Sequence, residues 1–229
     1  SGHSNFHSIQ TKLEQRFSSG LTFINSFMWG KAMDDRAIRS AGNRAGIQNH
    51  YDMDGSYGLS SFDVRLKYSF SYVYQFPGGN NAFTRGWQLS GILSAQSGRP
   101  LTPTLGANVA NVGNTSYPDR VCDGKLSNPT EDKWFDPSCF VAPAKYTYGN
   151  SGNGIISSDG FFNMDMAFIK NSYLFDESVN VQFRVEMFNL TDHVNYGFPE
   201  TRVDRSTAGS IGTLLGNPTQ VQLGLRIVY

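Results

Sequence analysis

The feature that most constrains this chain is a strict alternation of side-chain type from Phe62 to Phe76. Every even-numbered position in this stretch is apolar or aromatic, and every odd position except Val73 is polar. Because successive side chains of a β-strand point to opposite faces, this period of two predicts a strand with one apolar and one polar face. Strands of soluble proteins commonly span about five or six residues. A longer strand with an aromatic face is typical of one that crosses a bilayer, which takes about 9–11 residues at a tilt.

The same alternation recurs along the whole chain. In Val179–Met187, valine, phenylalanine and methionine alternate with asparagine, glutamine, arginine and glutamate. Aromatic residues make up 14% of the chain and charged residues only 17%, with 24 glycines, a composition that favours strands and turns over helices. We therefore predict seven antiparallel strands, near residues 6–17, 21–30, 62–76, 86–97, 161–170, 179–189 and 220–229.

The links between these strands alternate between short and long. Residues 18–20, 77–85 and 171–178 make short links, whereas residues 31–61, 98–160 and 190–219 make long ones. Compact soluble domains rarely hold several long loops without secondary structure. Outer-membrane barrels combine short periplasmic turns with long extracellular loops. The pattern therefore favours a transmembrane barrel over the alternative, a large soluble β-sandwich whose alternating face packs a core.

The overall charge and hydropathy exclude several other classes of protein. The chain has 19 basic and 19 acidic residues, so bulk electrostatics do not draw it to nucleic acid. It contains no run of about 20 apolar residues that could form a transmembrane helix. The N-terminus shows no basic stretch followed by an apolar core, so no signal peptide is visible and we expect the chain to begin inside a larger precursor.

The expected fold is therefore an all-β, antiparallel transmembrane β-barrel segment of about seven strands. In hydrocarbon every backbone N–H and C=O group must be paired, so strands persist there only in a closed barrel. Bacterial single-chain barrels have even numbers of strands from eight upward, and seven strands alone would leave two open edges in lipid. We expect the edges to meet the remainder of a larger barrel or other copies of the chain.

Two cysteines lie in one polar link between predicted strands. Cys122 and Cys139 are surrounded by proline, asparagine and aspartate. In an oxidising compartment a bond between them would close a loop of about 18 residues and contribute roughly 3 kcal/mol. The alternative is two unrelated thiols of a cytosolic protein. We predict the disulfide, because exposed loop thiols are otherwise reactive.

The sequence offers few candidates for chemistry, and we expect no enzyme activity and no cofactor. There is no Gly-x-Ser-x-Gly, Ser-x-x-Lys or His-Glu-x-x-His motif. His3 and His7 share one strand face and could in principle hold a metal, but solvated terminal residues are the preferred interpretation. The stretch Asp52–Gly55 resembles the start of a calcium loop, yet Asp63 stands where the closing glutamate belongs, so a polar turn is favoured.

Several charged residues fall on the polar faces of the predicted strands. They could line a water-filled lumen. Alternatively, they could form structural ladders by pairing with one another on the sheet face, which is the interpretation we favour. These residues are Arg65, Lys67, Arg184, Glu186 and Arg226.

A set of segments, in order along nearly the whole chain, carries a resemblance to a known family. These segments are Ser4–Gln10, Arg16–Phe23, Lys31–Asp35, Tyr57–Arg65, Gly86–Gly91, Trp134–Phe140 and Phe183–Leu190. Together they resemble the Oar-like TonB-dependent receptors abundant in Acidobacteria. The C-terminal Val221–Tyr229, with Leu225, Ile227 and Tyr229, is similar to the aromatic signal by which barrels are recognised for membrane insertion.

This resemblance implies a function and a set of partners. The resemblance implies a 22-stranded barrel, an N-terminal plug and a motif that engages the energy-transducing protein TonB. Residues 1–229 match about the last third of such a barrel and show neither plug nor motif. The expected function is that of an outer-membrane receptor fragment for uptake of an unidentified substrate, with contact to TonB only through the N-terminal part. The alternative is a truncated barrel piece that self-assembles as a surface or interaction protein.

Overall fold

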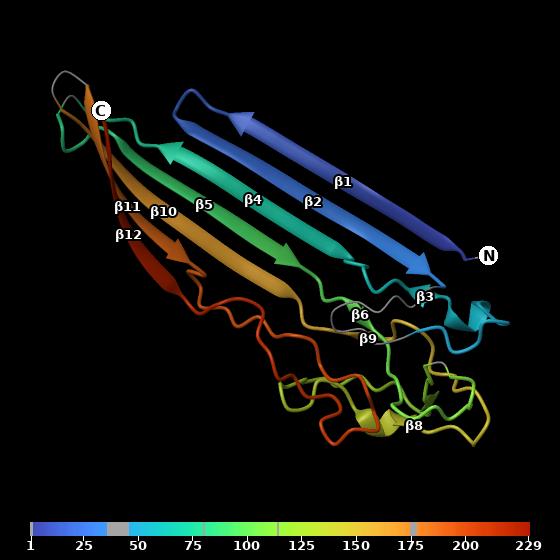
Figure 1. Cartoon of the computed structure of the whole chain (residues 1–229). Coiled ribbons are helices and arrows are strands. Elements are labelled where there is room, and N and C mark those ends of the chain that lie inside the picture. The colour runs from blue at the N-terminus through green and yellow to red at the C-terminus, as the bar shows by residue number, and fades with distance from the viewer. Residues whose placement is uncertain (1, 36–45, 80, 114, 175–177) are drawn as a thin grey trace.

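One antiparallel sheet of seven long strands dominates the molecule. The structure is a computed structural model and describes residues 2–35, 46–79, 81–113, 115–174 and 178–229. The strands follow one another across the sheet in chain order, as in a meander (Figure 1). They are β1 (Ser4–Arg16), β2 (Leu21–Asp34), β4 (Leu66–Gln75), β5 (Trp87–Gln96), β10 (Phe161–Leu174), β11 (Val179–Phe188) and β12 (Gln220–Val228). All seven predicted strands are thereby confirmed, with corrections at some ends.

Three ends differ from the predicted bounds by four residues: β2 extends to Asp34, β10 extends to Leu174, and β4 begins at Leu66 rather than at Phe62. Ser60 and Asp63 form a turn in which Asp63 N–H donates to the Ser60 carbonyl at 2.9 Å. The Asp63 carboxylate then accepts the Ala32 N–H of β2 at 2.7 Å, taking the place of a strand partner. The alternation therefore continues in sequence through Phe62 and Val64, although a side-chain hydrogen bond has replaced the ladder there.

The register keeps the alternation in phase across the whole sheet. Phe27 pairs with Tyr68, Tyr68 with Ala95, and Ala95 with Phe162. Because paired residues point to the same side of a sheet, the apolar sets of all seven strands share one surface, which we call the apolar face. The opposite surface, with the serine, asparagine, glutamine and most charged positions, is the polar face. Apolar-face residues include Ile9, Leu13, Phe23, Phe70, Tyr72, Leu93, Met164, Phe168, Val185, Leu223 and Leu225.

The apolar face is not covered by another layer. Leu225 is 69% exposed and Ile9 is 58% exposed, and many other large apolar side chains of the face are exposed as well. Water-soluble monomers rarely expose contiguous apolar patches beyond a few hundred Å². Such a sheet needs an apolar environment, and this side is the one that would face lipid.

The sheet is open in this chain, so the barrel is not closed. β1 pairs with β2 alone among the long strands, and β12 with β11 alone. Both edge strands run in the same direction, from the end of the sheet with the long links to the end with the short turns. Figure 1 shows the N-terminus at the first of these ends and the C-terminus at the second.

The three long links gather at one end of the sheet and fold into a compact body, the loop cap, made of described residues within 35–65, 97–160 and 189–219 (Figure 1). Its buried apolar cluster is formed by Leu101, Phe135, Cys139, Phe140 and Ile156. The cap contains β3 (Gly58–Leu59), β6 (Pro100–Leu101), β7 (Asp119–Arg120), β8 (Phe140–Val141), β9 (Ile156–Ser157) and two 3₁₀ turns, η1 (Asp54–Ser56) and η2 (Pro137–Cys139). Within the described ranges, no helix has the length and apolar character needed to span a membrane.

Candidate functional site

The polar face carries a hollow of about 420 Å³ near the middle of the sheet. Its lining comes mainly from polar-face residues of β2, β4, β5, β10 and β11. One row across the strands runs from Ile24 through Ser71 and Ile92 to Asp165, and the neighbouring row includes Val73 and Ser90. Apolar side chains thus alternate with hydroxyls over most of the hollow, and acidic side chains stand at its β10–β11 side. This surface suits a ligand that has both apolar and polar groups.

Two carboxylates border the hollow, and both are held in position. Glu186 of β11 forms an ion pair with Arg184 on the same face, at 2.7 Å. On β10, Asp165 Oδ1 accepts hydrogen bonds from Asn163 Nδ2 and from the Asn189 N–H, each at 2.9 Å. Their geometry is therefore fixed before any ligand arrives, which lowers the entropic cost of binding.

Asn189 is a residue that the sequence analysis did not identify. It follows β11 with a φ of 47°, in the left-handed region that asparagine tolerates better than most residues. Its side chain is buried and donates to the carbonyls of His193 and Asn217 at 3.1 and 3.0 Å. Asn189 thus ties the end of β11 to β10 and to the last long link. The only sequence signal for it is an asparagine placed directly after an alternating run.

The five charged residues proposed for the polar face are not gathered in one place. Arg184 and Glu186 pair with each other, as a structural ladder would require. Arg226 of β12 lies opposite Gln182, and Lys67 of β4 lies between Met28 and Gln96. Among the described residues neither Lys67 nor Arg226 forms an ion pair. Arg65 precedes β4 and is exposed, with its carbonyl accepting the Gly30 N–H.

The predicted disulfide between Cys122 and Cys139 is confirmed. The two Cα atoms are 4.8 Å apart, and the bond lies in the loop cap, where Cys139 is buried. The Val121 N–H donates to the Cys139 carbonyl at 2.9 Å, beside the β7–β8 pair. The bond therefore closes the loop between β7 and β8 at its base and connects it to the apolar core of the cap.

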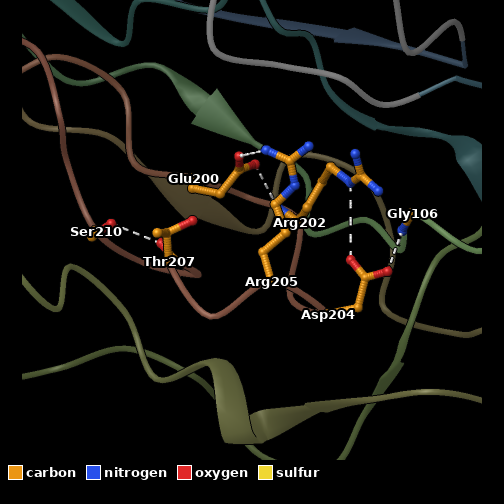
Figure 2. Close-up of polar contacts among 7 residues, drawn as sticks. All are labelled: Gly106, Glu200, Arg202, Asp204, Arg205, Thr207 and Ser210. Carbon is orange, nitrogen blue, oxygen red and sulfur yellow. Dashed lines mark hydrogen bonds and ion pairs between the residues drawn. The ribbon is translucent and has the colours of Figure 1, made fainter.

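A charged clasp joins two of the long links within the loop cap (Figure 2). Arg205 pairs with Glu200 at 2.9 Å, and Glu200 also accepts the Arg202 N–H at 3.1 Å. Asp204 accepts the Gly106 N–H at 2.8 Å, which connects this last link to the link after β5. A Cβ at Gly106 would overlap the Arg202 guanidinium, so a larger residue there would have to displace the Arg202 side chain. The charges of the two arginines and the two acidic residues neutralise one another, so the clasp holds the cap together.

Three groups of the loop cap have shifted pKa values. Burial raises the pKa of the fully buried Tyr117 to about 12. At the start of η2, hydrogen bonds from Ser138, together with nearby Lys133, lower the pKa of Asp136. The negative charge of Glu131 raises the pKa of Tyr196. None of these groups faces the hollow, so the shifts concern the stability of the cap.

The residues considered for metal binding have other roles in the structure. His3 and His7 are exposed in or next to β1, and the His3 N–H donates to the Asp35 carboxylate at 2.6 Å. Asp52 accepts the Gly55 N–H, and Asp63 is 4% exposed and bonded to β2. In the parts of the chain that the structure describes, no three acidic, histidine or cysteine side chains are grouped as metal ligands.

The C-terminal residues of the proposed insertion signal lie at the edge of the sheet. Leu225 and Ile227 belong to the apolar face of β12, opposite Phe183 and Val181. Tyr229 follows β12 and is exposed, at the end of the sheet that carries the short turns. Their aromatic and aliphatic side chains are thus presented outward along the last strand.

Comparison with known proteins identifies the class of this chain. The model of the outer membrane beta barrel domain family matches residues 1–222, and the chain belongs to that family. The protein is accordingly a component of the bacterial outer membrane, and the predicted fold class and location are confirmed. The match is to the barrel domain in general rather than to one class of receptor. No curated protein matches the chain in sequence.

Proposed function

We propose that the chain is the C-terminal part of the barrel of a TonB-dependent receptor that takes up a substrate across the outer membrane. The observation that carries this proposal is the amphipathic hollow on the polar face, bordered by the fixed carboxylates Asp165 and Glu186. In a barrel whose apolar face meets lipid, the polar face lines the lumen. A solute that crosses the barrel would pass over this hollow.

The loop cap gives the proposed receptor a folded outer surface. Outer-membrane barrels place short turns in the periplasm and long loops outside the cell, so the cap would be extracellular. A disulfide closes a loop within the link between β5 and β10, and the charged clasp joins this link to the last one. A preorganised surface of this kind costs less entropy when it binds a ligand than free loops would.

Strand direction favours a larger barrel over a ring of identical chains. β1 and β12 run in the same direction, whereas neighbouring strands of known outer-membrane barrels are antiparallel. Copies inserted with their caps on the same side of the membrane would bring β1 of one copy beside β12 of the next in parallel. An odd number of additional strands restores antiparallel pairing at both edges. We therefore infer that the edges pair with further strands of the receptor. We also propose that the chain has no catalytic activity of its own.

The alternative is a barrel piece that self-assembles as a surface or interaction protein. The folded cap supports this alternative equally, because an ordered extracellular surface suits binding of a partner as well as binding of a solute. A requirement for TonB distinguishes the two functions, because adhesion at the cell surface does not need the energy that TonB transmits.

Uptake by cells tests the proposal. Depletion of compounds from a defined mixture is followed in cells with the intact gene, without the gene, and without TonB. We expect at least one compound whose uptake requires both the gene and TonB. Substitution Ile92→Trp, which fills the hollow, should lower this uptake severalfold, while Leu93→Trp on the adjacent apolar-face position should leave it nearly unchanged. Equal uptake without TonB would refute the receptor function and leave the interaction role.

A further inference from the structure

The apolar face of the sheet carries only two charged side chains within the long strands, and both are lysines. Lys31 lies near the loop-cap end of β2 and Lys170 near the short-turn end of β10. All acidic side chains of these strands belong to the polar face. The charged strand residues of the polar face are Lys12, Glu14, Arg16, Asp34, Lys67, Asp165, Arg184, Glu186 and Arg226. The lipid-facing side thus has a net positive charge at each end of its apolar band.

The Lys170 ammonium is hydrogen-bonded within the protein. Its ammonium donates to the carbonyls of Ala82, Arg85 and Asn171, at 2.8, 2.6 and 3.1 Å. These bonds use all three of its donors. The ammonium also lies 5.4 Å from the centre of the Trp87 ring. Lys170 therefore anchors the turn between β4 and β5.

Lys31 has a different environment. It is exposed, and its ammonium makes no hydrogen bond or ion pair with any described residue. Its cross-strand partner is the exposed His7 of β1. Directly paired residues of antiparallel strands have Cβ atoms about 5 Å apart, so the two side chains can reach one anion together. Asn5, the next residue on this face of β1, has its amide bonded to the Tyr57 hydroxyl at 3.1 Å.

The pair His7–Lys31 stands where the apolar band ends. The row before it is Ile9 with Trp29, both exposed and apolar. From Leu21 to Trp29 the apolar face of β2 spans about 27 Å along the strand at 3.4 Å per residue, which is about 21 Å along the membrane normal at a tilt of about 40°. The next outward position on the same face, Lys31, lies about 26 Å from Leu21 along the normal, at the rim of the apolar band of about 25 Å that outer-membrane barrels present. It is therefore level with the lipid headgroups of the outer leaflet.

We propose that Lys31 and His7 bind the phosphate of a lipid headgroup in the outer leaflet of the membrane. Lys31 supplies a full positive charge and three donors, and His7 supplies a ring N–H. Asp35, four residues after Lys31, is 2% exposed and accepts the His3 N–H, so it does not neutralise the pair at the surface. This proposal depends on the outer-membrane location of the chain and does not depend on the proposed uptake of a substrate.

Lipid retention by the purified full chain tests the site. The chain is prepared in detergent and mixed with phosphorylated lipid A or with enzymatically dephosphorylated lipid A, and bound lipid is counted by native mass spectrometry. We expect the double variant His7→Gln with Lys31→Gln to bind phosphorylated lipid A about tenfold more weakly, through loss of charge-assisted hydrogen bonds. Lys67→Gln is the matched control, because Lys67 is an exposed lysine at the same end of the sheet on the polar face.

Two results would overturn the site. One is an equal loss of lipid in Lys67→Gln, which would mean that charge anywhere on the chain attracts the lipid. The other is displacement of the lipid by inorganic phosphate at comparable concentration, which would mean that the pair binds free anions instead of a headgroup. Intact lipid binding together with uptake that is independent of TonB would keep the site and reject the receptor function.

Discussion

Single polar side chains determine where two of the long strands begin or end. Asp63 accepts the Ala32 N–H and thereby delays the start of β4, while Asn189 ends β11 and holds three segments together. Both are short side chains whose oxygen or amide competes well with backbone partners. They stand inside or beside alternating stretches, so side-chain periodicity alone does not reveal them.

The buried phenol of Tyr117 makes the loop cap sensitive to alkali. Tyrosine ordinarily ionises near pH 10, whereas burial raises the pKa of Tyr117 to about 12. The folded cap therefore holds this proton more tightly than the unfolded chain does. Its contribution to stability is fully present below about pH 10 and is lost as the pH rises through about 12.

We expect Tyr117→Phe to flatten this alkaline loss, because phenylalanine keeps the ring and has no proton to release. Stability of the cap is measured by urea titration at several pH values between neutrality and about pH 12. Tyr51→Phe, at a fully exposed tyrosine, is the control and should leave the pH profile unchanged. Identical profiles for wild type and Tyr117→Phe would contradict the assignment.

At the scale of the strand, the two faces predict opposite responses to the same substitution. Phe70 and Ser71 are neighbours in the middle of β4, on the apolar and the polar face respectively. Arginine on the lipid face at the bilayer midplane costs about 2–4 kcal/mol, whereas a lumen position can hydrate it. We expect Phe70→Arg to lower the stability of the membrane-inserted protein by this amount and Ser71→Arg to change it little.

Denaturant titration of the barrel folded into lipid vesicles measures both variants. The wild-type protein and Ser71→Arg should have similar midpoints, with Phe70→Arg well below them. A larger loss for Ser71→Arg than for Phe70→Arg would mean that the lipid-facing side has been assigned the wrong way round.

The alternation predicted the seven strands and the face that each apolar residue occupies, because a buried face imposes a period of two on the sequence. It did not predict the length of β10, whose last residues pair through polar groups. There Asn171 accepts from Asn180 and Gln182, and an amide ladder leaves no hydropathy pattern. The hollow was also not predictable, since it depends on residues from five strands in register.

At the scale of the whole molecule, the apolar core and the main sheet are separate. Apart from Ile169 of β10, the buried apolar residues lie in the loop cap, and the exposed apolar surface lies mostly on the sheet. The long links have no recognisable pattern of side chains, because their contacts join segments far apart in the chain, such as Gly106 with Asp204. The cap should therefore lose its structure independently of the sheet.

Removal of the disulfide tests this independence. We expect Cys122→Ser with Cys139→Ser to destabilise the cap by roughly 3 kcal/mol, the chain-entropy value for a loop of this size. Limited proteolysis should then cut the link between β5 and β10 faster, while the strand signal in circular dichroism stays unchanged. The clasp variant Arg205→Gln, which breaks an exposed ion pair, should have a much smaller effect. Loss of the strand signal in the cysteine variant would show that cap and sheet unfold together.

The behaviour of the isolated chain without detergent follows from the two faces and the two open edges. Edge strands β1 and β12 present unpaired backbone groups, and the apolar face presents large side chains such as Leu225 and Ile9 to water. Either feature promotes association, by strand addition or by stacking of sheets. Light scattering in detergent-free buffer should therefore find assemblies, and detergent should disperse them. A monodisperse species of 25.4 kDa in plain buffer would mean that the aromatic residues of β2, β4 and β10 pack an internal core in this chain, and the lipid-facing assignment of that face would have to be withdrawn.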